Sequence, residues 1–245
     1  MNRAIFGATL AFISPLWVAA EEGRGPACEN WAAKVAVAEH RRDSGIQELR
    51  SVRRYLLHNA RWKKDAVMTV LFTQDESGRK RYSVLDQQAE GIQREVLERI
   101  LKGEVEASGR KEEDASFSPR NYEFTPIGYQ AVDGKKFLVV QVKPRRKSKV
   151  LLEGRAWIDT EEASIYQMEG RPSKSLSFWV GKPYVKQDFR KVGDFWLSST
   201  NHSTADVRLL GKTDLTIQYL DYSITPKHGE ILMACTRTCS PHLAE

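Results

Sequence analysis

Residues that could do chemistry are spread along the 245-residue chain without the spacing that catalysis requires. No two histidines stand in an HxxxH or HExxH pattern, which disfavours a zinc hydrolase. The sequence also contains no GxSxG nucleophile motif and no glycine-rich phosphate loop. The adjacent carboxylates Asp75-Glu76 and Glu161-Glu162 fall in predicted turns, where solvated side chains are ordinary. We therefore expect no catalytic residues, no metal and no cofactor, and an enzyme with a less familiar site stays open only as a third hypothesis.

Three cysteines, Cys28, Cys235 and Cys239, could form disulfides if the chain is exported. Three thiols cannot all pair within one chain, so one is left over or bonds another molecule. Cys235 and Cys239 would close a small loop and are the preferred pair, while Cys28 bonded to the C-terminal tail is the alternative. Two close cysteines without a second cluster are weak grounds for a metal site, and no CxxC motif supports a redox role.

A run of basic residues between two predicted strands is the most highly charged stretch of the expected surface. It is either a solvated hairpin loop or a contact site for anionic lipid head groups or an acidic partner. Its members are Lys143, Arg145, Arg146, Lys147 and Lys149.

The first twenty residues have the three parts of a secretory signal peptide. A basic start at Arg3 precedes an apolar stretch, and the small residues Ala19 and Ala20 form the cleavage pattern. Cleavage would remove Arg3 and no acid, so the formal net charge would fall from +6 to about +5. We expect an exported, soluble protein with no nucleic-acid partner. The expected parts are the signal peptide over 1–20, one domain over 21–223 with an exposed linker near 104–119, and a cysteine-bearing tail over 224–245.

Two helices and many strands are predicted to form the body of the protein. Helical spacing of apolar residues predicts helices over 28–41 and 87–102, the second ending at Gly103 as a C-cap. Asp133-Gly134 between two β-rich runs predicts a hairpin. The predicted strands are 46–59, 66–72, 79–85, 122–132, 135–142, 150–158, 164–169, 176–180, 185–191, 194–199, 204–210 and 215–222.

Apolar and polar residues alternate through most of these strands, which predicts a long antiparallel sheet with one apolar face. Because two helices cover little of that face, we expect a mainly β fold of the α+β kind. In this fold the sheet curls into an incomplete β-barrel, with the helices lining or lidding an apolar cavity. Alternation by itself leaves open whether the interior is ordinary core or a lipid-sized cavity. The candidate lipid-binding residues on this face are Leu138, Val140, Val142, Leu152, Ala156, Ile158, Tyr166, Met168, Leu176, Phe178, Val180, Leu215, Ile217 and Tyr219.

Three successive segments resemble the bacterial lipoprotein-carrier superfamily, whose best-known members are LolA and LolB. They are KKFLVVQVKP from Lys135, VLLEGRAWID from Val150 and IYQMEG from Ile165, and the resemblance covers about residues 120–223. It implies an incomplete barrel with helices over an apolar cavity and a periplasmic location. It further implies binding of acyl chains or handling of lipoproteins, without catalysis.

The leading hypothesis is therefore a periplasmic carrier or chaperone for a lipid or an acylated lipoprotein, with an inner- or outer-membrane protein as a further partner. The alternative is a periplasmic sensor or interaction module that uses the barrel as a protein-binding scaffold. In the first case the hairpin within residues 151–170 is barrel wall, and its contribution is shape and apolar lining.

Overall fold

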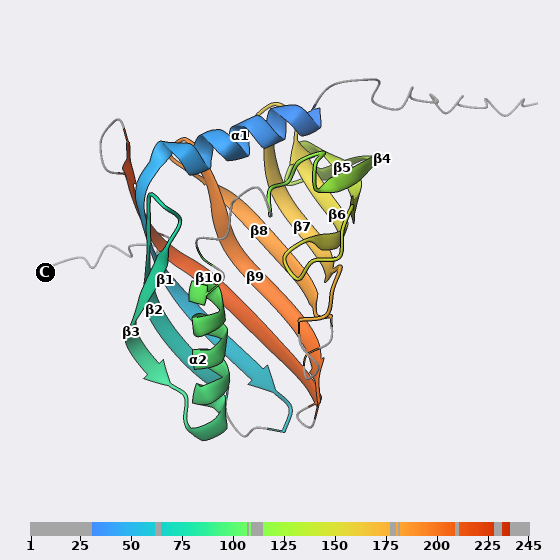
Figure 1. Cartoon of the computed structure of the whole chain (residues 1–245). Coiled ribbons are helices and arrows are strands. Elements are labelled where there is room, and N and C mark those ends of the chain that lie inside the picture. Colours follow the sequence, from blue (N-terminus) through green and yellow to red (C-terminus); the bar gives the residue numbers. More distant parts are fainter. Residues whose placement is uncertain are drawn as a thin grey trace, which may run out of the picture.

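The computed structural model describes residues 31–61, 65–106, 108, 115–176, 180, 182–208, 211–227 and 232–235. The predicted signal peptide, Cys28, Phe178 and Cys239 lie outside these residues. The described chain forms two helices and one sheet of eleven strands (Figure 1). Neither described helix has the length and hydropathy needed to cross a bilayer.

The N-terminal part confirms the predicted helix, three-strand meander and second helix. In order, the elements are α1 (Trp31–Gly45), β1 (Ile46–Asn59), β2 (Ala66–Asp75), β3 (Lys80–Gln88) and α2 (Gly91–Glu106). The second helix continues past Gly103, where the sequence predicted its end. Leu97, Leu101 and Val105 stand four residues apart and all contact the same apolar cluster, so the apolar stripe of the helix runs on through the glycine.

The remaining strands follow the predicted meander with two differences. They are β4 (Tyr122–Val132), β5 (Lys135–Pro144), β6 (Leu152–Asp159), β7 (Ser164–Pro172), β8 (Tyr184–Val192), β9 (Phe195–Val207), β10 (Gly211–Pro226) and β11 (Leu232–Cys235). The predicted strands 194–199 and 204–210 are one strand, β9. The predicted strand 176–180 is wrong, since Leu176 and Val180 lie in bends between β7 and β8. Ser173 and Lys174 hydrogen-bond to Ser148 in the loop after β5, which turns the chain away from the sheet.

The strands pair antiparallel in the order β3-β2-β1-β10-β9-β8-β7-β6-β5-β4. β11 pairs with the C-terminal half of β10, beside the part of β10 that pairs with β9. The sheet curls without closing, and α2 lies against its concave side over β1 and β2 (Figure 1). The fold is thus the incomplete barrel that the sequence predicted.

The hairpin of β6 and β7 contains a close backbone crossing at two paired glycines. Gly154 and Gly170 lie opposite each other in the ladder. A Cβ atom on Gly154 would lie 2.0 Å from the carbonyl oxygen of Glu169, and one on Gly170 would lie 2.2 Å from that of Glu153. Only residues without a side chain fit at this crossing, so the hairpin contributes to the curvature of the sheet.

Two apolar clusters fill the concave side of the sheet, one under each helix. The α1 cluster consists of the buried residues Trp31, Val35, Phe117, Tyr122, Leu138, Val140, Val142, Leu151, Ala156, Ile158 and Ile165. The α2 cluster consists of Tyr55, Leu57, Ala66, Met68, Val70, Phe72, Ala89, Leu97, Leu101 and Ile217. A smaller group of Val192, Leu197, Tyr222 and Ile224 lies between them on β8, β9 and β10.

Candidate functional site

The candidate lipid-binding residues are divided between the two clusters. Leu138, Val140, Val142, Ala156 and Ile158 are buried in the α1 cluster, and Met168 packs against it. Leu215, Ile217 and Tyr219 instead belong to or pack against the α2 cluster. The face that the alternation predicted is therefore the concave face, and its role in lipid binding stays a prediction.

Tyr166 does not lie on the expected face. A register shift between β6 and β7 pairs Trp157 with Gln167 but Ile158 with Ile165, so Tyr166 is the extra residue of a β-bulge. Its ring stacks on Phe137 with centroids 4.3 Å apart, in a cluster on the convex face of the sheet. Because one inserted residue reverses the inward-outward alternation, the face assigned to Tyr166 from the sequence is wrong.

Four more candidate lipid-binding residues lie away from both clusters or outside the residues that the structure describes. Leu152 is half-buried and belongs to neither cluster, whereas its neighbour Leu151 is fully buried in the α1 cluster. Leu176 is half-buried in the connection after β7, and Val180 lines a separate pocket of about 400 Å³ with polar walls. Phe178 lies outside the described residues. The expected pair of Cys235 and Cys239 stays a prediction for the same reason.

The basic run after β5 contains two structural arginines and three exposed lysines. Arg145 donates from Nε to the carbonyl of Pro119 at 2.9 Å, and Arg146 donates to the side chain of Asn121. These bonds fix the loop to the turn before β4. All five basic residues are exposed, and Lys143, Lys147 and Lys149 are the ones that do not fix the loop to this turn.

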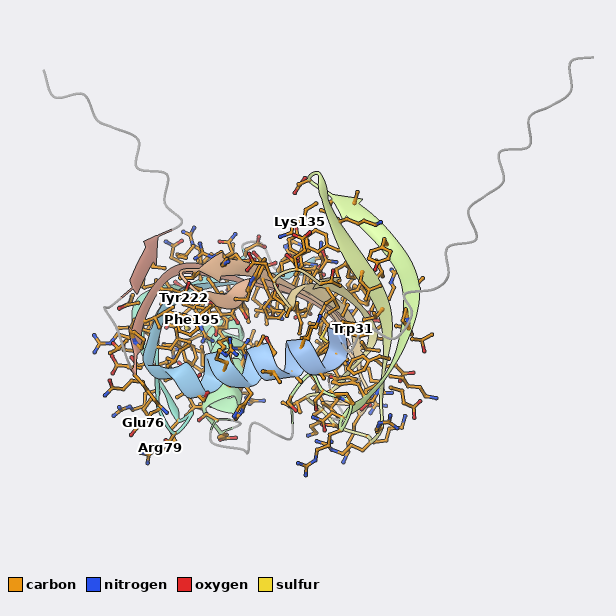
Figure 2. All side chains as sticks on the ribbon, turned by 90° about the horizontal axis from the view of Figure 1, so that it is seen from above. Trp31, Glu76, Arg79, Lys135, Phe195 and Tyr222 are labelled. Carbon is orange, nitrogen blue, oxygen red and sulfur yellow. The ribbon has the colours of Figure 1, made fainter. Side chains whose placement is uncertain are left out.

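A pocket of about 310 Å³ opens on the concave side, between the C-terminal half of α1, the β2–β3 turn and the end of α2. Seen from above, α1 crosses from Trp31 toward Tyr222 and Phe195, with the turn that carries Glu76 and Arg79 beside its far end (Figure 2). The lining is mixed, with charged residues from α1, β1, β3 and α2 and apolar residues from β1, β8 and β9. Among the predicted lipid-binding residues, Tyr219 lines this pocket.

A buried arginine lies at the floor of the pocket. Arg53 is 7% exposed and occupies an inward position of β1, between Ser51 and Tyr55. It donates from Nε to Ser51 Oγ at 2.9 Å and from an Nη to Glu104 Oε2 at 2.8 Å. Its guanidinium lies 4.1 Å from the ring centroid of Phe72 and 4.8 Å from that of Tyr219, so cation–π contacts partly replace the water it has lost.

Glu104 connects α2 to the sheet. Besides the ion pair with Arg53, it accepts a hydrogen bond from the hydroxyl of Tyr55 at 2.7 Å. Burial raises the pKa of Tyr55, and the adjacent carboxylate of Glu104 raises it further, so the phenol stays a hydrogen-bond donor. A charged group on the helix thus meets a charged group of the sheet at the edge of the α2 cluster.

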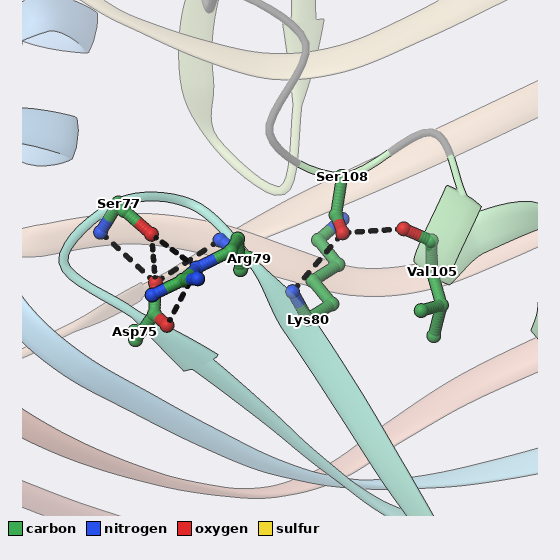
Figure 3. A network of polar contacts seen from close by, with 6 residues as sticks. All are labelled: Asp75, Ser77, Arg79, Lys80, Val105 and Ser108. Carbon is green, nitrogen blue, oxygen red and sulfur yellow. Dashed lines mark hydrogen bonds and ion pairs between the residues drawn. The ribbon is translucent and has the colours of Figure 1, made fainter.

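Lys80 begins β3 on the same face as Tyr82, which packs on Phe72 of the α2 cluster. Its backbone N–H donates to Ser108 Oγ at 3.1 Å, and that hydroxyl donates to the carbonyl of Val105 at the end of α2 (Figure 3). Burial lowers the pKa of Lys80, and repulsion by Arg53 lowers it further. The backbone position of this lysine is therefore fixed by both β3 and the end of α2.

Sequence reasoning did not single out Arg53, Lys80 or Glu104. Glu104 was assigned to a linker because Gly103 was interpreted as a helix end, although Leu97, Leu101 and Val105 continue the stripe. Alternation within β1 could have shown that Arg53 shares the inward face with Tyr55. No local pattern predicts that these three charges meet, since they come from three separate elements.

The histidines and carboxylates that opened the sequence analysis form no cluster in the described residues. His58 Nδ1 lies 2.6 Å from Asp65 at an exposed position, and His202 contacts Thr216. Among the residues that the structure describes, no group of three or more His, Cys, Asp or Glu side chains could hold a metal ion.

No family model matches this sequence, and no curated protein matches it. Among solved structures, the chain is similar to a domain from Vibrio parahaemolyticus whose description is that of an outer-membrane lipoprotein-sorting protein. The two share 14% identity with a TM-score of 0.44, and the match covers 82% of this chain and 96% of that one.

Two further solved structures are similar to this chain. A DUF1329 family protein from Desulfovibrio piger is 10% identical with a TM-score of 0.39, covering 82% of this chain and 93% of that one. A LolA superfamily protein from Nitrosomonas europaea is 9% identical with a TM-score of 0.38, covering 78% and 92%.

Proposed function

We propose that this protein is an exported, periplasmic carrier or chaperone that holds the acyl chain of a lipid or lipoprotein against the concave face of its sheet. The observation that carries the proposal is the long apolar face, which the described chain covers with two helices and the 115–121 segment. An acyl chain is a ligand of matching chemistry, because it makes no demand for hydrogen bonds.

The α2 side of the face is the proposed place for the acyl chain. Moving α2 aside would expose Leu97 and Leu101, each buried by the helix contact, at a cost of about 1.5–3 kcal/mol per side chain. Burial of an acyl chain contributes about 0.8 kcal/mol per CH₂ group, so about ten such groups would contribute about 8 kcal/mol. The free energy gained by burying the acyl chain is thus of the same order as the cost of moving the helix.

The polar contacts of α2 suit a helix that can leave the sheet and return. Glu104 joins it to Arg53 and Tyr55 at one end, whereas its N-terminal half exposes Ile92 at 53%. An ion pair at the edge of the cluster gives the closed position a defined geometry, and its partners can be hydrated when the helix moves.

The first test is to identify what the protein carries. The protein is purified from the periplasm of an expressing cell, its native mass is measured, and bound molecules are extracted and identified. We expect a lipid or acylated peptide in stoichiometric amount. A ligand-free mass, together with no uptake of added fatty acid or phospholipid, would contradict the proposal.

A matched pair of variants locates the acyl chain. Val70 is fully buried in the α2 cluster, and Val70→Trp would fill space there at a cost in stability of about 1–3 kcal/mol. Val37, on α1, is 58% exposed, and Val37→Trp is the control. We expect Val70→Trp to reduce uptake of a fluorescent fatty acid while Val37→Trp does not, with circular dichroism showing that both variants fold. Equal uptake by the two variants would place the ligand elsewhere.

The second candidate function, a protein-interaction module, has support at the opposite edge of the sheet. β4 ends the sheet and exposes Ile127 at 58% and Tyr129 at 48%. Pro126 and the register shift after it interrupt the ladder there, so a partner would contact side chains rather than extend the sheet. Wild-type lipid uptake by the double variant Ile127→Ser/Tyr129→Ser, with loss of a protein that co-purifies with the wild type, would favour this function.

The exposed lysines of the basic loop are proposed to contact anionic head groups at the membrane surface. The variant with Gln at Lys143, Lys147 and Lys149 is expected to bind phosphatidylglycerol vesicles more weakly, by up to about 1 kcal/mol per lysine. The control carries Gln at three other exposed lysines, Lys34, Lys102 and Lys136. The same loss of vesicle binding in both variants would show that only the net charge of the protein matters.

A further inference from the structure

The floor of the pocket between α1, α2 and the β2–β3 turn carries two cations for one carboxylate. Arg53 and Lys80 both line it, and Glu104 pairs with Arg53 at 2.8 Å. The ammonium of Lys80 makes no ion pair or hydrogen bond with any residue that the structure describes. Attraction by Glu104 offsets only part of the Lys80 charge. A partly offset cation in a half-buried place is costly, and a bound anion would compensate it.

Two of the carboxylates at the rim of the pocket, Glu39 and Asp75, already have partners, so they do not supply this anion. Glu39 forms an ion pair with Arg42 at 3.0 Å. Asp75 accepts hydrogen bonds from Ser77 and lies 3.4 Å from Arg79 within its own turn (Figure 3). Glu76 is an exposed residue of that turn.

Arg53 has donors to offer to an anion. A guanidinium carries five N–H groups, and in the described chain Ser51 and Glu104 accept from Nε and from one Nη. The rings of Phe72 and Tyr219 hold the guanidinium plane in place without using its donors. The donors that remain belong to a side chain that lines the pocket.

Part of the wall next to these cations is apolar. Leu49, Phe189 and Leu197 line the same pocket. Tyr219 also lines it and packs on the α2 cluster, so the pocket and the α2 cluster are contiguous there. A ligand in this pocket therefore meets charge at the floor and apolar surface at the side. A volume of about 310 Å³ has room for a phosphate with the first atoms of a chain attached.

We propose that this pocket binds a phosphate group, with Lys80 as its ion-pair partner and Arg53 as a second donor. Where the phosphate is the head group of a lipid, this inference rests on the proposed carrier function and names its ligand class as anionic phospholipids. A free phosphate or a soluble phosphate ester would bring the same chemistry without an acyl chain.

Three probes separate these sources, and isothermal titration calorimetry measures each one on the mature protein. The probes are lauroyl-lysophosphatidylglycerol, monolauroylglycerol with the same chain and no phosphate, and inorganic phosphate. They are applied to the wild type, Lys80→Gln, Lys80→Arg and the control Lys102→Gln, which removes an exposed lysine of α2. Lipid probes are kept below their critical micelle concentrations.

The expected result is that the wild type prefers the lysophospholipid to monolauroylglycerol. Lys80→Gln should weaken lysophospholipid binding about tenfold to a hundredfold, as expected for loss of a charge-assisted contact, and leave monolauroylglycerol binding unchanged. Lys80→Arg should restore part of the affinity, and Lys102→Gln should behave as the wild type.

The remaining outcomes separate the two proposals. If only inorganic phosphate binds and needs Lys80, the phosphate site stands and the carrier function fails. If monolauroylglycerol binds but Lys80→Gln leaves lysophospholipid affinity unchanged, the carrier function stands and the phosphate site is overturned. If neither phosphate-bearing probe binds the wild type, the phosphate site is also overturned.

Discussion

The apolar cluster under α1 and the apolar cluster under α2 are built on the same sheet, yet their helices are held by different forces. Trp31 of α1 packs edge-on against Phe124, with ring centroids 5.3 Å apart, and the ring centroids of Phe117 and Phe124 lie 4.9 Å apart. Aromatic contacts therefore dominate the packing of α1. On the other side, Glu104 of α2 joins Arg53 and Tyr55 through charge and hydrogen bonds.

The difference suggests which side of the barrel is fixed. The segment before β4 is secured by Asn121, whose amide donates to the carbonyl of Ser116 at 2.8 Å and whose side-chain oxygen accepts from Arg146. Leu152 N–H donates to the hydroxyl of Tyr122 at 3.2 Å. Several short connections therefore tie the α1 cluster together. The α2 contact is apolar surface with polar contacts gathered at the C-terminal end of the helix.

The largest expected effect lies in the wall of the α1 side. Gly154→Ala would place a Cβ 2.0 Å from the carbonyl oxygen of Glu169, and backbone on both strands would have to move. We expect a loss of more than about 4 kcal/mol in the free energy of unfolding, or no folding, in urea titrations followed by tryptophan fluorescence.

Gly103→Ala is the matched control on the α2 side. A Cβ there meets nothing within 4 Å, and the residue lies inside a helix, so we expect a gain of about 0.5–1 kcal/mol. A loss of less than about 1 kcal/mol in Gly154→Ala would show that a small backbone shift relieves the clash at the paired glycines.

Trp31→Ala tests the aromatic contact of α1. Loss of a buried tryptophan costs about 3–5 kcal/mol, while the control Val37→Ala, at a position 58% exposed, should change stability by less than about 0.5 kcal/mol. Thermal unfolding measures both. If only α2 moves during uptake, Trp31→Ala should take up lipid at the wild-type rate under conditions in which it is folded. A faster rate would show that α1 also moves.

Glu104→Ala tests the charged edge of α2. It leaves Arg53 buried without its carboxylate, and because Glu104 is itself 25% exposed we expect a cost of about 2 kcal/mol rather than the full value for a buried pair. Amide hydrogen exchange in α2 should accelerate, while exchange in α1 should not.

The control for this helix is Glu98→Ala, whose exposed partner Arg94 lies 3.6 Å away. Such a pair contributes about 0.3–0.5 kcal/mol at most. If exchange in α2 accelerates equally in both variants, the ion pair with Arg53 does not hold the helix.

Tyr122→Phe is expected to change the free energy of unfolding least of these substitutions at neutral pH, and to change it more at alkaline pH. Loss of its hydrogen bond to Leu152 N–H costs about 1 kcal/mol. Burial raises the pKa of Tyr122 to about 12, from an ordinary value of 10.0. Below pH 10 the phenol is neutral in both states and its contribution is complete. As the pH rises from 10 through 12 the unfolded state ionises first, and up to about 2.7 kcal/mol of stability is lost.

Urea titrations at pH 9 and at pH 11.5 measure this loss, and the phenylalanine variant should lose less between them than the wild type. Burial also raises the pKa of Tyr55 and of Tyr222 near the α2 side, so both proteins should still lose stability in alkali. Identical losses in the two proteins would mean that Tyr122 ionises without unfolding.

The regular parts of the fold could be predicted because each depends on local pattern. β4 has the predicted bounds, and the hairpin to β5 turns at Asp133-Gly134, where Asp133 and Gly134 both have positive φ, 50° and 80°. Leu138, Val140 and Val142 lie on one face because the strand between them is unbroken. The predictions for Tyr166 and for the strand at 176–180 were wrong. A bulge decided the first, and hydrogen bonds to the carbonyl of the distant Ser148 decided the second.

The amino-acid sequence by itself determined the mainly β class, the curled antiparallel sheet and the apolar character of its concave face, since alternation, turn residues and helical spacing act within a few residues. Tertiary structure alone decided that this face divides into two clusters and that Arg53, Lys80 and Glu104 meet between them. These charges come from β1, β3 and α2, and only the pairing of β1 with β2 and β3 and the docking of α2 bring them within reach of one another. The pocket where we propose that a phosphate binds is thus a product of assembly, because no single segment of the chain carries it.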